Sequence, residues 1–193
     1  MSVPVSNMKE KLGPKLSMYP SLTTLVGAKV DGRPNFLPIA HVGIADMSTL
    51  TLGINRAHYT NKGIKENKTF SVNIPSESLV KKTDYCGLVS GKRVDKSGLF
   101  KVFYGELGNA PMIEECAVNM ECKLIQTVDM PEHELFIGKV VQTYASKEYM
   151  TGKAVDITKV KPLLFNMWDR GYYQLGPKLA DAWSVGKEMK EKC

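Results

Sequence analysis

Alternation of apolar and polar residues is the dominant pattern of this sequence, and it is typical of β-strands that bury one face. It predicts strands at residues 22–30, 35–45, 50–54, 69–74, 118–128, 135–144, 163–165 and 172–175. The first two strands flank Asp31-Gly32, a pair of residues that favours the tight turn of a β-hairpin. In the fourth strand, Phe70, Val72 and Ile74 share one face, which is therefore expected to lie in the core.

Helical spacing is found in three shorter stretches. The first covers residues 60–68, with Ile64 facing inward. The second is expected to begin with Ser76 as its N-cap and to run toward Cys86. The third is a charged C-terminal helix at about residues 178–192.

Strands outnumber helices, and the two do not alternate in the way that a parallel sheet requires. We therefore predict a mainly β fold with flanking helices, in which a β-barrel has the helices packed outside. No stretch rich in Pro, Gly or Ser divides the chain into halves. Residues 1–193 are thus expected to form a single domain.

The composition is that of a globular protein. Of 193 residues, 43% are hydrophobic and 24% are charged, which excludes a disordered, collagen-like or coiled-coil chain. No uncharged run approaches the roughly 20 apolar residues of a membrane span, and the first residues lack the apolar block of a secretory signal. A soluble, cytoplasmic protein with no membrane contact is expected.

Charge and cysteine content indicate which kinds of ligand the protein is expected to bind. The 26 basic and 20 acidic residues give a net charge of +6, but the lysines are scattered. A solvated basic surface is therefore favoured over nucleic-acid binding, although the charge permits a polyanion. The four cysteines form no CxxC pair and have no histidine at metal-ligand spacing, so they are expected to be small buried hydrophobic residues.

The common catalytic motifs are missing. Residues 87–93 look like a phosphate-binding P-loop, but three residues rather than four separate the glycines, and Arg93 stands where Ser or Thr should hold magnesium. The sequence has no GxGxxG after a strand, no GxSxG and no HExxH. His41, His58 and His133 lie in separate segments, so only the fold could bring them together. We predict no catalytic side chain and no metal site.

A polar stretch at residues 55–61 follows one predicted strand and opens a predicted helix. Free backbone N–H groups, the Thr60 hydroxyl and either Arg56 or His58 could converge there on one anion of phosphate size. The alternative is that Thr60 merely caps its helix and Arg56 is solvated.

A second polar stretch covers residues 86–96. Its two glycines would allow a ligand to approach the backbone closely, and Lys96 can supply positive charge. The alternative is an ordinary helix end.

Several spaced stretches of the sequence also share one family pattern. They are residues 54–74 (INRAHYTNKGIKENKTFSVNI), Thr83 to Gly87, Ser90-Gly91, Asp95-Lys96, Ala110 to Ile113, Glu121 to Lys123, His133 to Gly138 and Tyr172 to Gly176. Together they resemble the flavoredoxin group of the flavin reductase-like family. The resemblance covers roughly residues 17–176.

This resemblance implies an FMN-binding split β-barrel that forms a homodimer, with the flavin close to the subunit interface. The isoalloxazine ring is expected to be lined by Asn35, Ala40, His41 and Val42. The phosphate is expected to be held by Arg56, His58, Tyr59, Thr60 and Lys96. The second half of the chain is expected to contribute His133 and Phe165. The polar stretches add the cofactor-binding candidates Asn55, Ser90 and Gly91. His41 departs from the family pattern, because many relatives carry Trp at this position.

The resemblance leaves two related functions open. A flavoredoxin-like protein would carry electrons between a redox partner protein and an acceptor, whereas a flavin reductase would take hydride from NADH or NADPH. The absence of a dinucleotide fingerprint does not separate them, because split-barrel reductases lack it too. In both, the flavin performs the redox chemistry and the protein orients it. A flavin-free basic barrel that binds a polyanion is the alternative from another class.

Overall fold

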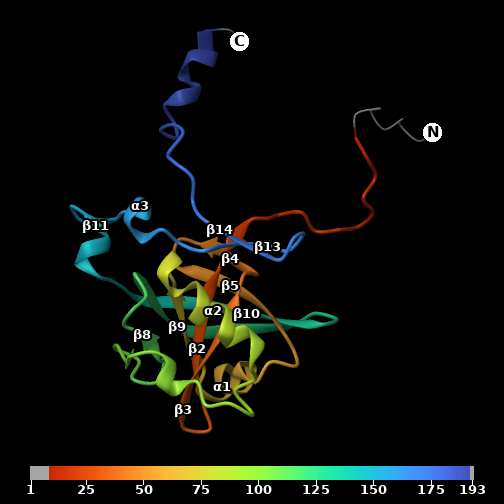
Figure 1. Cartoon of the computed structure of the whole chain (residues 1–193), viewed down its shortest axis with the longest axis vertical. Coiled ribbons are helices and arrows are strands. Elements are labelled where there is room, and N and C mark those ends of the chain that lie inside the picture. Colours follow the sequence, from red (N-terminus) through yellow and green to blue (C-terminus); the bar gives the residue numbers. More distant parts are fainter. Residues whose placement is uncertain (1–8, 192–193) are drawn as a thin grey trace.

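The computed structural model describes residues 9–191, and its main element is one seven-stranded antiparallel sheet (Figure 1). In chain order its strands are β2 (Thr24–Val30), β3 (Arg33–Ile39), β4 (Val42–Asp46), β5 (Thr49–Asn55), β6 (Thr69–Ile74), β9 (Val118–Asp129) and β10 (His133–Ala145). Their order across the sheet is β3-β2-β6-β9-β10-β5-β4. The mainly β fold and the β2–β3 hairpin at Asp31-Gly32 are confirmed.

The single strand expected over residues 35–45 is in fact two strands, and this correction explains the barrel. Ala40 and His41 separate β3 from β4, which lie at opposite edges of the sheet. The backbone N–H of Gly53 donates to the His41 carbonyl at 2.8 Å and fixes this link to β5. Two residues thus bring both edges together without a hydrogen-bonded ladder between them. The sheet curls but does not close, which makes it a split barrel.

Three smaller sheets and several short helices flank the barrel. The strands are β1 (Ser21–Leu22), β13 (Leu164–Asn166) and β14 (Gly171–Tyr173) in one sheet, β7 (Val102–Phe103) with β8 (Met112–Ile113), and β11 (Met150–Thr151) with β12 (Ala154–Val155). The α-helices are α1 (Thr60–Asn67), α2 (Val80–Leu88) and α3 (Ile157–Val160). The 3-10 helices are η1 (Glu77–Leu79), η2 (Ser97–Leu99), η3 (Lys147–Tyr149) and η4 (Val185–Glu191). Within this described part, no helix is long and apolar enough to cross a membrane.

Ser76 occupies the N-cap position of η1, as expected, but neither its side chain nor that of Thr60, the alternative cap of α1, makes a capping hydrogen bond. Ser76 lies before η1 with an extended backbone, forms a bridge to Pro162 and exchanges a hydrogen bond with the Ser78 hydroxyl, so its side chain caps no helix. Thr60 is the first residue of α1, and its hydroxyl accepts a hydrogen bond from the Asn35 side chain. The Ser76 hydroxyl is engaged locally, whereas the Thr60 hydroxyl is engaged by a tertiary contact that the local sequence does not reveal.

The C-terminal helix expected over 178–192 is also wrong. After β14 the chain runs away from the barrel (Figure 1), and only η4 is helical; residue 192 lies outside the described part. Leu179 and Trp183 are each 96% exposed. A helix of this length needs a packing surface, and Leu179 and Trp183 find none among residues 9–191.

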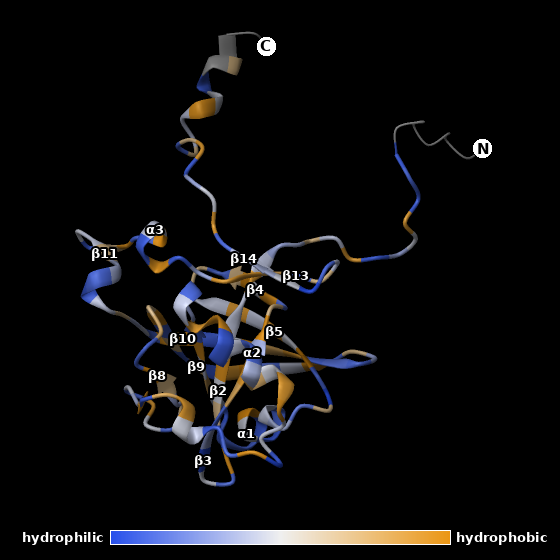
Figure 2. Cartoon of the chain, viewed as in Figure 1, coloured by the Kyte–Doolittle hydropathy of each residue, from blue (hydrophilic) through white to orange (hydrophobic). Residues whose placement is uncertain are grey.

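Apolar side chains fill the barrel, and the strands carry much of the orange in Figure 2. Phe70, Val72 and Ile74 lie in the main core cluster, which confirms their shared face. The thiols of Cys86, Cys116 and Cys122 are buried, as expected, while Cys193 lies outside the described residues. Burial raises the pKa of Cys86 to about 11 and that of Cys122 to about 12.

One buried charge holds the loop after β7 to the sheet. Glu121 in β9 is fully buried. Its Oε1 accepts from the Glu106 N–H and the Tyr144 hydroxyl, each at 2.8 Å, and its Oε2 accepts from the Leu107 N–H at 2.9 Å. All these donors depend on this carboxylate for their hydrogen bonds.

Candidate functional site

Two adjoining cavities lie beside the link between β3 and β4. The larger, about 280 Å³, is lined among others by Ala40, His41, Asn55, His133, Phe165 and Tyr172. The smaller, about 200 Å³, is lined among others by Asn35, Tyr59, Thr60, Ser90, Gly91 and Lys96. His58 lines both, so the two cavities adjoin at this residue. The structure thereby brings together most of the residues that the sequence suggested.

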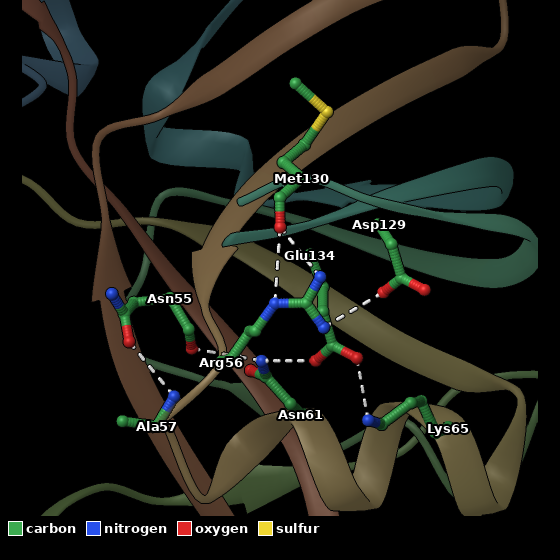
Figure 3. Close-up of polar contacts among 8 residues, drawn as sticks. All are labelled: Asn55, Arg56, Ala57, Asn61, Lys65, Asp129, Met130 and Glu134. Atoms are coloured by element: carbon green, nitrogen blue, oxygen red, sulfur yellow. Dashed lines mark hydrogen bonds and ion pairs between the residues drawn. The ribbon is translucent and has the colours of Figure 1, made fainter. Parts of the chain in front are cut away.

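Two of the suggested residues lie elsewhere. Val42 packs against the main core cluster and lines a separate apolar groove. Arg56 points toward the turn between β9 and β10 (Figure 3), where its Nη2 donates to the Met130 carbonyl at 2.7 Å and its Nη1 lies 3.1 Å from Asp129 Oδ1. Neither residue lines the two cavities, so the positive charge of Arg56 is used to anchor the loop after β5.

The loop between β5 and α1 is fixed by further polar contacts, also drawn in Figure 3. Asn55 Oδ1 accepts from the Ala57 N–H at 3.0 Å. Asn61 Nδ2 donates to the Asn55 carbonyl at 3.1 Å and to Glu134 Oε2 at 2.8 Å, and Lys65 pairs with the same carboxylate at 2.8 Å. This network holds His58 and Tyr59 between the two cavities.

The smaller cavity is built to attract an anion. Lys96 is only 2% exposed, and its Nζ donates to the carbonyls of Phe36 at 3.0 Å and Cys86 at 2.6 Å. An ammonium has three N–H groups, so one remains for a ligand. Burial lowers the pKa of Lys96. The N–H groups of Tyr59 and Thr60 at the start of α1 have no backbone acceptor in the described chain, and helix N-termini favour negative charge.

At Gly91 the backbone passes close to the side chains of Asn35 and Tyr59 in this cavity. A Cβ added at this position would lie 2.1 Å from Asn35 Oδ1 and 2.9 Å from the Tyr59 ring. Asn35 cannot easily turn aside, because it is buried and donates to Thr60 Oγ1 at 2.8 Å. The space at residue 91 therefore suits only a glycine.

Aromatic rings form part of the wall of the larger cavity: those of His41, His58, His133, Phe165 and Tyr172. The His41 and His133 centroids are 5.8 Å apart, and those of Phe165 and Tyr172 are also 5.8 Å apart. Tyr19 links the two pairs, with its hydroxyl 3.0 Å from His41 Nε2 and its ring 6.5 Å from Phe165. Such walls suit a flat conjugated ring.

Polar groups at the same cavity could bind the edges of such a ring. Thr23 Oγ1 is buried and has no hydrogen-bond partner in the described structure, which leaves it free for a ligand. The Tyr172 hydroxyl donates to Asp84 at 3.1 Å, and burial together with Asp84 raises the pKa of this tyrosine to about 12. Sequence reasoning missed Thr23 as a lining residue, because only the fold shows that its hydroxyl is unpartnered.

The fold and the site together define a split-barrel protein whose cationic cavity adjoins a cavity for a flat ring, an arrangement suited to a phosphorylated aromatic cofactor. The flavin reductase like domain model matches residues 16–176, and the chain belongs to this flavin-binding family. It is 44% identical to a flavoredoxin from Methanosarcina acetivorans, with a TM-score of 0.91 over 94% of this chain and 98% of that one. It is 34% identical to the flavoredoxin of Desulfovibrio vulgaris (Miyazaki F), with a TM-score of 0.87 over 93% and 100%.

A more distant structure shares the fold alone. An FMN-binding protein from Thermus thermophilus with bound 1-cyclohex-2-enone is 23% identical and has a TM-score of 0.74 over 90% of this chain and 98% of that one. The family and the two flavoredoxins together establish a flavin-binding redox protein.

Proposed function

We propose that this protein holds FMN and carries electrons between a redox partner protein and an acceptor. The observation that supports FMN is the joining of a ring-lined cavity to a small cationic cavity at His58. The larger cavity would accept the flavin ring, and the smaller cavity would accept its single phosphate. Bound flavin would supply reversible electron transfer.

Different residues of the chain would then bind the phosphate and the ring of the flavin. Lys96, Thr60, Ser90 and the free N–H groups at the start of α1 would hold the phosphate. Thr23 and the surrounding rings would orient the isoalloxazine and keep water from one side of it. No side chain needs to act as a nucleophile.

The cofactor assignment is tested by the absorption spectrum of the purified protein and by the mass of the flavin released from it. FMN is expected. FAD would contradict the assignment of the smaller cavity to a terminal phosphate. A protein that stays colourless after reconstitution attempts would favour the flavin-free, polyanion-binding alternative.

The carrier function is supported by the likeness to two flavoredoxins and by the net charge of +6, which would attract an acidic redox partner. The test is anaerobic stopped-flow reduction by NADH and NADPH, compared with reduction by a low-potential iron–sulfur protein. Reduction by the iron–sulfur donor should be faster and should slow as salt is added. Fast, saturable reduction by a nucleotide would instead identify an NAD(P)H-dependent flavin reductase.

Replacing Lys96 by methionine should weaken FMN binding about tenfold, because a charge-assisted hydrogen bond to the phosphate is lost. The measurement is the Kd of FMN by quenching of flavin fluorescence. Lys92→Met removes the same charge from an exposed position in the same loop and should change the Kd less than about twofold. Equal Kd values for the two variants would show that the phosphate lies elsewhere.

We further propose that a second copy of the chain covers the apolar groove beside β4. This groove, about 530 Å³, is lined by residues that include Leu22, Val42, Ile44 and Met47. Ile44 is 93% exposed and Met47 is 99% exposed. Exposed apolar surface of this kind marks an interaction site, and a twofold dimer is the commonest way to cover it.

Ile44→Asp should therefore raise the dimer dissociation constant about tenfold, because it places a charge in an apolar interface. Analytical ultracentrifugation over a concentration series measures this change. Ile157→Asp makes the same replacement at a half-exposed position on α3 and serves as the control. A wild-type protein that is monomeric at micromolar concentration with FMN bound would contradict the dimer.

A further inference from the structure

All three histidines of the chain line the larger cavity. They come from three separate places: the link between β3 and β4, the loop before α1, and the start of β10. Histidine is the side chain that ordinarily titrates near neutral pH. The chain therefore concentrates such groups at a single cavity.

The backbone places two of these imidazoles side by side. The His41 carbonyl accepts from the Gly53 N–H at 2.8 Å, and His133 pairs with Asn55 in the ladder between β10 and β5. Both histidines are thus positioned by the last residues of β5, and their ring centroids are 5.8 Å apart. His41 Nε2 is also 3.0 Å from the Tyr19 hydroxyl of the N-terminal segment.

The acidic and titratable groups around His41 determine how its protonation is balanced. Among the described residues that line the larger cavity there is no Asp or Glu, and the titratable neighbours of His41 are Tyr19, Tyr172 and the other histidines. Asp84 is engaged with the Tyr172 hydroxyl. Partial burial, with a smaller effect of His133, lowers the pKa of His41. His41 is therefore neutral at pH 7 while the cavity carries no negative charge.

Reduction of a flavin would change this balance. Two electrons and one proton convert a neutral isoalloxazine into its reduced, anionic form, so one negative charge would appear beside the histidines. We propose that His41 binds a proton from solvent at that moment, and that the resulting imidazolium neutralises the new charge. Reduction would then take up two protons for every two electrons, one on the flavin and one on His41. This inference rests on the proposed binding of flavin in the larger cavity.

His58 provides an internal comparison. It lies at the junction with the smaller cavity, where burial, Lys96 and His133 lower its pKa. A phosphate bound there is equally anionic in both redox states. The titration of His58 should therefore respond to FMN binding, whereas the titration of His41 should respond to reduction.

The test is an NMR titration of the imidazole C–H signals in flavin-free protein, oxidised holoprotein and holoprotein reduced with dithionite. With three histidines, each signal is assigned by its loss in a single His→Gln variant. The titration midpoint of His41 should rise by about one pH unit or more on reduction. That of His58 should rise on FMN binding and then stay within a few tenths of a unit.

A second readout is the number of protons taken up per two electrons, obtained from the pH dependence of the flavin midpoint potential. Near pH 6.5 it should fall by up to one in His41→Gln relative to wild type. Holoprotein whose His41 midpoint is the same in both redox states would overturn this inference and leave flavin binding intact. Protein that binds no flavin would overturn the proposed function, and this inference with it.

Discussion

Alanine at position 91 is expected to weaken FMN binding by roughly tenfold to a hundredfold, the largest loss for any single methyl group in this site. The added Cβ would lie 2.1 Å from Asn35 Oδ1 and 2.9 Å from the Tyr59 ring. Either Asn35 gives up its hydrogen bond to Thr60 or the loop shifts into the smaller cavity. Isothermal titration calorimetry measures the loss.

Gly98→Ala is the matched control, since a Cβ at residue 98 meets no atom within 4 Å. It lies a few residues further along the chain and should leave the Kd of FMN unchanged. Wild-type affinity in Gly91→Ala would show that the smaller cavity does not hold the phosphate. Equal losses in the two variants would point to a general sensitivity of this segment and not to the cavity.

Glu121→Ala is expected to destabilise the protein by about 3 to 5 kcal/mol, which is a large share of the stability of one domain. The substitution leaves the N–H groups of Glu106 and Leu107 and the Tyr144 hydroxyl without their acceptor, and it empties a fully buried position. Urea denaturation followed by circular dichroism gives the free energy of unfolding.

Glu114→Ala removes an exposed carboxylate from a nearby segment and should change the free energy of unfolding by less than about 0.5 kcal/mol. Flavin-free protein is used for both variants, so that ligand binding does not mask the difference. A loss below about 1 kcal/mol in Glu121→Ala would mean that water takes over the three hydrogen bonds.

The sequence predicts individual strands well, because side-chain alternation reports directly on a half-buried strand. The sequence does not predict which strands pair with each other. No turn sequence separates residues 35–39 from residues 42–45, yet β3 pairs with β2 and β4 pairs with β5. Only nonlocal pairing reveals that the chain changes from one edge of the sheet to the other at Ala40 and His41.

In the candidate site, too, local features could be predicted from the sequence and long-range contacts could not. Two polar stretches are recognisable because each lies at the end of an element, and the fold brings them to one cavity around Thr60 and Lys96. The direction of Arg56 could not be predicted, since its acceptor, Met130, is 74 residues away along the chain. The placement of the Thr23 hydroxyl in the larger cavity likewise depends on neighbours that are remote in sequence.

The two-residue link between β3 and β4 also bears on how fast a cofactor can exchange. No backbone ladder joins these strands where His41 borders the larger cavity. We expect a ligand to leave there through rotation of side chains, which takes picoseconds to nanoseconds when the groups are exposed. Opening of the amides in β6 and β9 would require global unfolding and be far slower. The dissociation rate of the flavin and the unfolding rate of the barrel should therefore vary independently among variants.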